Sequence, residues 1–158
     1  MIELRKIDGE NWEEVAELEV HESQKDFVAP NMYSLAESYI DLMLEAMPPI
    51  TFAIYSGDTP VGFAKIEYEP ENENEICDGP YYWMCRFMID KNHQGKGFGK
   101  QAMEKVLEHI RTFPHGPAAA LYLSYKPEND FVRGFYKSFG FVETGQPFHG
   151  EVVAKVVL

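Results

Sequence analysis

The sequence predicts an α/β fold: a mixed, mostly antiparallel sheet of six to seven strands, with a central parallel pair and about four helices on both faces. Residues 81–89 (YYWMCRFMI) are almost wholly apolar or aromatic, which is typical of a strand buried on both faces. A glycine-rich turn and an amphipathic helix over 97–111 come next, and 118–125 is a second apolar run. This strand–helix–strand unit has the length of a right-handed crossover, so its two strands are expected to be parallel neighbours.

Two helices are expected before this unit. The first begins at Asn11, which with Glu14 has the spacing of a capping box. The second begins at Ser34, which forms a better capping box with Glu37, and it ends before the proline pair that starts at Pro48. The apolar residues expected on the second helix are Leu35, Tyr39, Leu42, Met43 and Ala46.

The remaining elements are short strands and one more helix. A hairpin with strands at 50–55 and 61–68 is expected to turn at 56–59. A helix over 129–139 carries an apolar stripe, and strands are expected at 2–7 and 152–158. No linker, repeat or low-complexity tract divides the chain, so residues 1–158 are expected to form a single domain.

Charge and composition limit the classes of function. The 158 residues include 14 Lys and Arg against 26 Asp and Glu, a formal net charge of −12. A negative field repels nucleic acid and anionic membranes, and it favours a small cationic substrate. Cys77 and Cys85, the only cysteines, have no metal-ligand spacing, so no metal is expected. There is no signal peptide and no run of about 18 apolar residues, so a cytoplasmic protein is expected.

The turn after the first apolar strand is the most informative segment. Gly95, Gly97 and Gly99 allow the backbone there to approach a ligand closely, and the free N–H groups at the start of a helix attract anions. In an otherwise acidic chain, lysines gather at this turn. The sequence therefore predicts a phosphate-binding turn whose members are Gln94, Gly95, Lys96, Gly97, Phe98, Gly99 and Lys100.

Two common glycine patterns do not explain this turn. A P-loop requires Ser or Thr after Gly-Lys, but Gln101 comes after Gly99-Lys100 here. The dinucleotide pattern matches at Gly97, Gly99 and Ala102, but too few residues remain after it to supply the other Rossmann strands. Neither a P-loop nor a dinucleotide site is therefore expected.

A third pattern, Gln/Arg-x-x-Gly-x-Gly/Ala, is met by Gln94, Gly97 and Gly99. With Asn129 and the run from Phe135-Tyr136 to Phe141, the sequence resembles the GCN5-related N-acetyltransferase (GNAT) superfamily. The order of elements agrees over essentially the whole chain. The resemblance implies a fold of this superfamily, acetyl-CoA as cofactor and transfer of an acetyl group to a primary amine by direct attack in a ternary complex.

The resemblance also implies roles for individual residues. The turn would hold the pyrophosphate of coenzyme A, and Asn129 would bind its pantetheine arm. Tyr136 would be the general acid that protonates the departing thiolate. Backbone groups of the first apolar strand would bind the pantetheine arm and stabilise the oxyanion, and they belong to Phe87, Met88 and Ile89.

The general base stays open at this stage. Many members of the family carry Glu where this chain has Cys85. Glu67, Glu69 and Asp78 are nearby candidates, as is a chain of water molecules. A covalent route through Cys85 is disfavoured, because a strand buried on both faces favours an inert thiol.

The segment from Gln24 to Ala36, together with residues 83–90 and the glycine-rich turn, resembles bacterial diamine (spermine/spermidine) N-acetyltransferases. The resemblance implies a polyamine acceptor, which needs spaced carboxylates and aromatic faces for cation–π contacts. The residues predicted to bind the acceptor are Glu22, Tyr33, Glu67, Glu69 and Trp83.

Three alternatives stay open. The acceptor could be an aminoglycoside or a protein or peptide amine, and the chain could instead be a non-catalytic sensor of acyl-CoA. A homodimer is also expected, because dimers are common in the superfamily and an exposed sheet edge is a plausible place for one.

Overall fold

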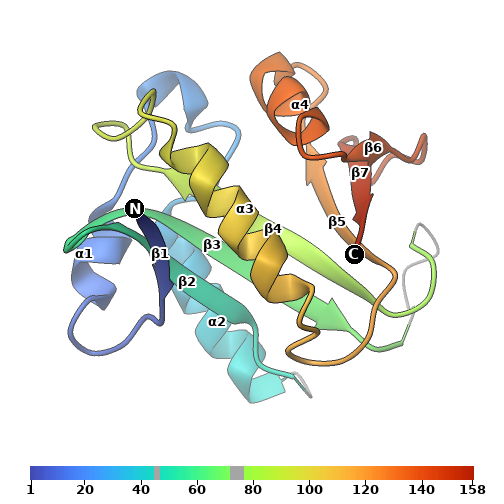
Figure 1. The fold of residues 1–158 in the computed structure, drawn as a ribbon, viewed down its shortest axis with the longest axis horizontal. Coiled ribbons are helices and arrows are strands. Elements are labelled where there is room, and N and C mark those ends of the chain that lie inside the picture. The colour runs from blue at the N-terminus through green and yellow to red at the C-terminus, as the bar shows by residue number, and fades with distance from the viewer. Residues whose placement is uncertain (45–46, 72–76) are drawn as a thin grey trace.

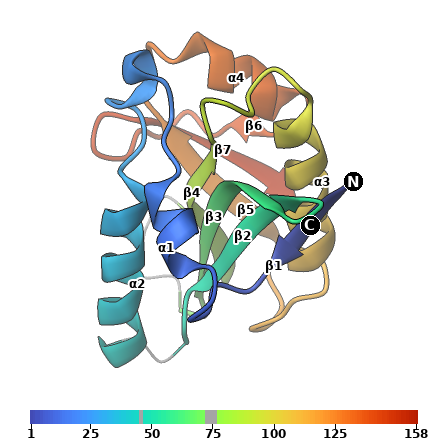
Figure 2. The same ribbon diagram turned by 90° about the vertical axis from the view of Figure 1, so that its left-hand side faces the viewer.

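A computed structural model describes residues 1–44, 47–71 and 77–158. Within these residues, seven strands form one mixed sheet in the order β1-β2-β3-β4-β5-β7-β6, with helices on both faces (Figures 1 and 2). The fold class predicted from the sequence is therefore confirmed. The strands are β1 (Ile2–Arg5), β2 (Ile50–Ser56), β3 (Thr59–Glu69), β4 (Tyr81–Ile89), β5 (Ala120–Tyr125), β6 (Val142–Glu143) and β7 (Val152–Val157).

The helices divide between the two faces of the sheet. They are α1 (Trp12–Glu17), a 3-10 turn η1 (Glu22–Gln24), α2 (Asn31–Leu44), α3 (Phe98–Ile110) and α4 (Asp130–Lys137). The main core packs the apolar face of α3 and side chains of α4 against the sheet. A second apolar cluster joins the sheet to α1 and the start of α2 on the opposite face. Figure 2 shows α2 and α3 on opposite sides of the strands.

None of the helices in the described residues is long and apolar enough to cross a membrane.

The predicted parallel pair is the centre of the sheet. β4 and β5 pair in parallel at only two positions, Tyr82 with Leu121 and Trp83 with Tyr122. Beyond Trp83 the two strands diverge, β4 toward the start of α3 and β5 toward α4 (Figure 1). The rest of β4 therefore has a strand partner, β3, along one edge only.

A bulge interrupts β4 just past the point where β5 leaves it. Lys65 on β3 lies opposite Arg86, and the next β3 residue, Ile66, lies opposite Met84. Cys85 is therefore the extra residue of β4, with no β3 residue opposite it. Bulges bend a strand and increase its twist, which agrees with the divergence from β5.

α1 begins where the sequence predicts, but its N-cap differs from the prediction. Asn11 is the N-cap residue, but its side chain accepts a hydrogen bond from the N–H of Asp8 and donates one to the carbonyl of Lys6. The capping box is therefore absent. The helix ends at Glu17 because Leu18 is extended, with ψ of 134°.

The start of α2 also differs from the prediction. The helix begins at Asn31, and the carbonyl of Pro30 accepts the bond from the N–H of Ser34. Ser34 is thus fully buried inside the helix, and Glu37 bonds to Lys65 rather than to a helix terminus. Of the apolar residues expected on this helix, Tyr39, Leu42 and Met43 are exposed, Leu35 is half-buried and Ala46 lies outside the described residues.

Candidate active site

The glycine-rich turn places an open helix N-terminus at the end of β4. Gly97 is the N-cap residue of α3 with φ of 78°, and Gly95 has φ of 75°. Both conformations favour glycine, and a Cβ at either position would meet no atom within 4 Å. No side chain caps α3, and its first N–H groups have no hydrogen-bond acceptor in the part of the chain that the structure describes. This arrangement fits a phosphate group.

Gln94 has a structural role in this turn. Its side-chain amide donates to the carbonyl of Ile89 at 2.9 Å and to the side chain of Gln24 at 2.8 Å. These bonds fix the turn to the end of β4 and to η1. The side chain is therefore already engaged within the protein, and the backbone of the turn is the part left to bind a ligand.

The lysines of the turn differ in their contacts. Lys91 pairs with the carboxylate of Glu19 at 2.9 Å, and Lys96 donates to the carbonyl of Asn92 at 2.9 Å. Lys100 is exposed and forms no ion pair within the described residues. Lys100 is therefore the lysine most available to an incoming phosphate.

Helix α4 spans the region where β4 and β5 diverge. Phe135 stacks on Phe87 of β4, with ring centroids 6.0 Å apart. Its neighbour Tyr136 stacks on Tyr125 of β5, also at 6.0 Å. Two consecutive residues of one helix thus contact both diverging strands, which places Tyr136 beside the gap between them.

The hydroxyl of Tyr136 suits a proton donor. It forms no hydrogen bond within the described residues, so its proton is not committed to another group. Burial raises the pKa of Tyr136 above its ordinary value, and the nearby Tyr125 raises it further. The phenol therefore stays protonated throughout the neutral range.

Asn129 is the N-cap residue of α4. Its side-chain oxygen accepts a bond from the N–H of Val132 at 3.5 Å. Its side-chain NH₂ forms no hydrogen bond within the described residues, so it remains free to donate to a ligand. One amide can therefore cap the helix and bind a ligand at the same time.

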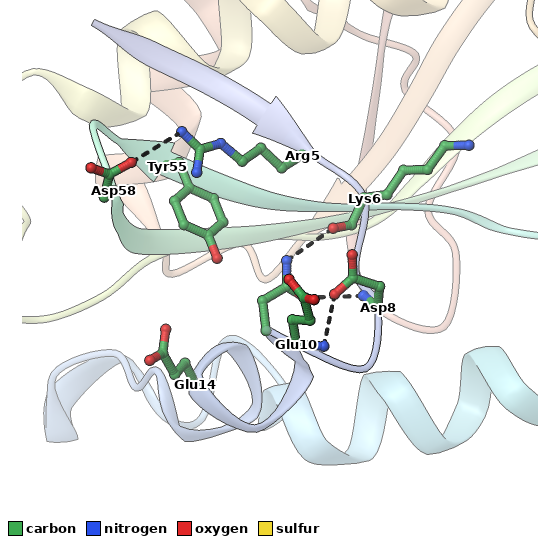
Figure 3. Close-up of a pocket in the computed structure, with 8 residues that line it drawn as sticks. Arg5, Lys6, Asp8, Glu10, Glu14, Tyr55 and Asp58 are labelled. Atoms are coloured by element: carbon green, nitrogen blue, oxygen red, sulfur yellow. Dashed lines mark hydrogen bonds and ion pairs between the residues drawn. The ribbon is translucent and has the colours of Figure 1, made fainter.

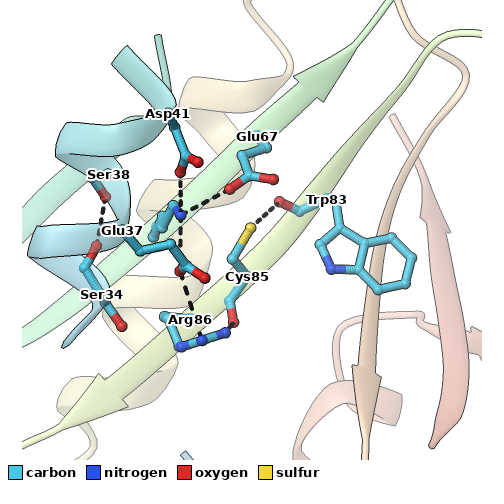
Figure 4. A network of polar contacts seen from close by, with 9 residues as sticks. Ser34, Glu37, Ser38, Asp41, Glu67, Trp83, Cys85 and Arg86 are labelled. Atoms are coloured by element: carbon cyan, nitrogen blue, oxygen red, sulfur yellow. Dashed lines mark hydrogen bonds and ion pairs between the residues drawn. The ribbon is translucent and has the colours of Figure 1, made fainter. Parts of the chain in front are cut away.

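A charged cluster lies between α2 and the sheet, on the face opposite α3 (Figure 4). We call it the α2-face cluster; its members are Glu37, Asp41, Lys65, Glu67, Cys85 and Arg86. Lys65 is only 1% exposed, and its ammonium lies 2.7 Å from Asp41, 2.9 Å from Glu67 and 3.0 Å from Glu37. Burial would lower the pKa of Lys65, but these hydrogen bonds outweigh it and raise the pKa above its ordinary value. Lys65 is therefore a permanent internal cation.

The extra residue of the β4 bulge completes this cluster. Burial raises the pKa of the Cys85 thiol well above its ordinary value, and the neighbouring Glu67 carboxylate raises it further. The thiol is therefore protonated at neutral pH, which disfavours a covalent acetyl-cysteine route. Arg86 lies 3.7 Å from Glu37, and its buried Nε has no hydrogen-bond partner among the described residues.

An aromatic cluster adjoins these charges on the same face. Trp83 pairs with Glu67 across the β3–β4 ladder, so the two side chains are neighbours. The indole stacks on Tyr122 of β5, with ring planes 6° apart, and meets the edges of Phe148 and Tyr81. Two of the residues predicted to bind the acceptor, Glu67 and Trp83, are thus neighbours, whereas sequence reasoning did not identify Tyr122 and Phe148 around the indole.

Of the other predicted acceptor residues, Glu22 and Tyr33 lie away from both clusters. Glu22 forms an exposed ion pair with Lys25 at 2.8 Å, and Tyr33 is exposed on α2. Neither forms a hydrogen bond, ion pair or ring contact with either cluster within the described residues. Glu69 lies opposite Tyr81, and Asp78 pairs with Lys155 at 3.3 Å and is exposed.

Sequence reasoning missed most of the α2-face cluster. Its members come from α2, β3 and β4, which are joined only by the tertiary fold. One signal was available: Lys65 interrupts the apolar run from Val61 to Ile66, and Glu37 and Asp41 stand four residues apart on a helix of mostly apolar residues. A buried lysine needs carboxylate partners, but only Glu67, two residues along the same strand, is near it in the sequence.

A shallow hollow lies at the far edge of the sheet, beside β1 (Figure 3). It is lined by residues of both signs, including the ion pair of Arg5 with Asp58 at 3.8 Å. β1 and β4 are separated by two strands in the sheet order. The hollow is therefore separate from the residues described above.

Comparison with known proteins agrees with this geometry. A spermine/spermidine N(1)-acetyltransferase of Bacillus subtilis (strain 168) is 28% identical over 153 residues, covering 96% of this chain and 95% of that protein. The structure of the PaiA N-acetyltransferase from Thermoplasma acidophilum in complex with coenzyme A matches with a TM-score of 0.69 and 14% identity, covering 100% and 99% of the two chains.

A third similar protein is AAC(6')-Iy in complex with a bisubstrate analogue, CoA-S-monomethyl-acetylneamine. It matches with a TM-score of 0.66 and 17% identity over 94% of this chain and 95% of that one. The model of the acetyltransferase (GNAT) family matches residues 9–141. The chain therefore belongs to the acetyltransferase (GNAT) family, whose acetyl donor is acetyl-CoA.

Proposed function

We propose that this acetyltransferase acetylates a primary amine of a polyamine such as spermine or spermidine. The observation that carries the proposal is the α2-face cluster beside the aromatic cluster: the carboxylate of Glu67, which shares Lys65 with Glu37 and Asp41, lies across the strand ladder from Trp83. A polyamine needs carboxylates for its ammonium groups and aromatic faces for its cations and methylenes. The similarity to a spermine/spermidine acetyltransferase supports the same acceptor.

The donor-binding role falls to the residues around the gap between β4 and β5. Acetyl-CoA supplies an acetyl group activated as a thioester. The backbone of the turn from Gln94 to Lys100 is assigned to its pyrophosphate, and the free NH₂ of Asn129 to its arm. The backbone of Phe87, Met88 and Ile89 is assigned to the arm and to the developing oxyanion, because this part of β4 lacks a strand on the β5 side.

Tyr136 is proposed as the general acid. Its phenol lies beside the gap, is protonated at neutral pH and has an uncommitted proton. When the bond between carbonyl carbon and sulfur breaks, the thiolate takes this proton. A phenol held in its neutral form is suited to that task.

Glu67 is proposed as the base that accepts the proton lost by the attacking amine. It neighbours Cys85, the position where many members of the family carry Glu, and it is partly exposed. Asp78 is paired with Lys155 and exposed, which makes it a weaker candidate. The proton can pass to Glu67 directly or through one water molecule.

Lys65 gives the site a distinct charge balance. Three carboxylates of the α2-face cluster face two fixed cations, Lys65 and Arg86. The cluster thus keeps one net negative charge, matched by one ammonium of the acceptor. Further ammonium groups of a polyamine would have to reach carboxylates beyond the cluster.

The test is a panel of acceptors assayed by release of free thiol from acetyl-CoA. The panel holds spermine, spermidine, putrescine, an aminoglycoside and a lysine peptide. We expect kcat/KM to be at least tenfold higher for spermine or spermidine than for the others. Preference for the aminoglycoside or the peptide would overturn the polyamine assignment and leave the family assignment intact. Binding of acetyl-CoA without turnover on any amine would favour a sensor.

A further inference from the structure

Helix α2 carries its polar side chains toward the protein and its apolar side chains toward solvent. The side chains on its sheet side are polar: Asn31, Ser34, Glu37, Ser38 and Asp41. The residues on its outward face are Met32, Tyr33, Ala36, Tyr39, Ile40, Met43 and Leu44, and all of them are exposed. We call this set the outer face of α2. A surface helix of a lone globular protein has the reverse pattern.

The inward polarity has a clear cause in the sheet beneath. Asn31 donates to the carbonyl of Val15 at 2.8 Å, and Glu37 and Asp41 bond to Lys65. The helix is therefore held to the sheet mainly by hydrogen bonds and ion pairs. Leu35 packs against the second apolar cluster, whereas the residues of the outer face are exposed, and Figure 2 shows no element beyond α2 on that side.

The outer face is large enough to be an interface. Its six large side chains are between 52% and 77% exposed. If a fully exposed large side chain has an accessible surface of about 200 Å², these six together expose roughly 700 Å². Each partner of a standard protein–protein interface buries about 800 Å², which is a similar area. Patches of this size on monomers mark interaction sites.

We propose that the outer face of α2 is the interface of a homodimer, in which α2 of one copy packs on α2 of a second copy across a two-fold axis. A two-fold axis makes any such patch complementary to itself. Ala36 lies near the middle of the helix and would let two helices approach closely. This assigns the dimer contact to a helix face rather than to a sheet edge.

Charge restricts where two copies can meet. Each chain carries a net charge of −12, so two copies repel one another over most of their surface. The outer face of α2 has no charged residue, because Glu37 and Asp41 point to Lys65. It is therefore a surface on which two copies can meet without opposing like charges.

A membrane surface fits the outer face less well. Helices that lie in a membrane interface carry Lys and Arg along their polar face. α2 contains neither, and its polar face is bonded to the sheet. The net charge of −12 also opposes an approach to anionic lipid.

The test is the mass of the protein in solution, measured by sedimentation velocity from about 1 to 100 μM, a range that spans dissociation constants typical of weak and strong dimers. We expect the wild type to sediment as two chains of 18.1 kDa. The double variant Ile40→Glu/Met43→Glu is expected to be a monomer, because it sets like charges across the two-fold axis. Far-UV circular dichroism checks that this variant is folded.

Val142→Glu is the matched control. Val142 is also exposed and apolar, but it lies on β6 at the edge of the sheet, so the same substitution there is expected to leave the dimer intact. A second readout needs no destabilised variant: Ala36→Cys or Ile40→Cys is expected to form a disulfide between two copies under mild oxidation.

Three outcomes would overturn the proposal. A wild type that stays at the mass of one chain at 100 μM excludes self-association here and leaves the face to a different partner. A dimer that persists in the folded double variant excludes α2. A dimer lost in Val142→Glu but kept in the double variant would place the contact at the sheet edge. None of these measurements depends on which amine the enzyme acetylates.

Discussion

The ammonium of Lys65 lies 2.9 Å from the carboxylate of Glu67, although Lys65 is 1% exposed and Glu67 is about one-third exposed. A buried cation thus bonds to a carboxylate that solvent and substrate can still reach. Asp41 and Glu37 complete the contacts of Lys65 on the α2 side. The same cation therefore ties α2 to the sheet and orients the proposed base.

We expect Lys65→Met to lower the free energy of unfolding by about 2–4 kcal/mol, because it leaves three adjacent carboxylates without their cation. The lower part of that range reflects their partial exposure. Urea denaturation measures the change. Lys105→Met is the control: Lys105 pairs with Glu108 on the exposed side of α3, and its loss should cost about 0.5 kcal/mol or less. Equal losses in the two variants would contradict a special role of Lys65.

Glu67→Gln is expected to lower kcat/KM by about 100-fold, because the amide cannot accept the proton of the amine. Asp41→Asn is the matched control. It removes a bond to the same Lys65, but it lies on α2 rather than beside Cys85. Asp41 belongs to the proposed acceptor site, so its loss should act on KM; a fall in kcat in Asp41→Asn as large as in Glu67→Gln would show that the Lys65 contacts matter and that Glu67 is not the base.

Tyr136→Phe is expected to lower kcat by about 100-fold or more while acetyl-CoA still binds, because the ring that stacks on Tyr125 is kept. Calorimetric titration measures the binding, and thiol release measures the turnover. Unchanged turnover would remove Tyr136 from the mechanism.

The raised pKa of Tyr136 also sets the pH dependence of the wild type. As pH rises, more of the amine loses its proton, so kcat/KM should increase. The phenol is the acidic form needed for proton donation, and a raised pKa keeps it protonated to higher pH than an ordinary tyrosine. The alkaline decline should therefore be absent up to about pH 10. A decline between about pH 8 and 9 would indicate a different acid.

Gly97→Ala is expected to weaken acetyl-CoA binding at least tenfold. Its Cβ would stand in the open space at the start of α3, and its φ of 78° is unfavourable for alanine. Gly57→Ala is the control, since Gly57 also has a positive φ and open surroundings but lies in the β2–β3 turn. Both variants should lose about 1 kcal/mol of stability, and only Gly97→Ala should change the KM for acetyl-CoA. A similar KM in both would contradict a phosphate site at the turn.

The strands and the long helix could be predicted because their signals are local. The run from Tyr81 to Ile89 is apolar apart from Arg86 and its bounds match the prediction to the residue, and those of α3 match to within one residue at each end. The parallel pairing could be inferred from the length of the crossover. The roles of Asn129 and Tyr136 came from a family pattern, which spans few positions.

The errors arose where a polar side chain bonds to a partner other than the helix terminus. Asn11 and Glu37 both had capping-box spacing, but the first bonds to Lys6 and Asp8, and the second to Lys65, 28 residues away. A spacing rule assumes that the helix terminus is the best available partner. In a folded chain a buried ammonium is a stronger one, and its position depends on strand register that no local pattern contains.

The short ladder between β4 and β5 has a consequence for cooperativity. The sheet consists of two halves, β1–β4 and β5–β7–β6, that meet only where β4 pairs with β5. Within the described residues this pairing comprises two residue pairs, whereas β5 and β7 share six residue pairs. Such halves can open as separate units with different free energies. Amide hydrogen exchange in the free enzyme should therefore be faster in β5 and β7 than in β2 and β3. A ligand that bonds to both halves raises the free energy of opening of the weaker one, so donor binding should bring the exchange rates of the two halves closer together.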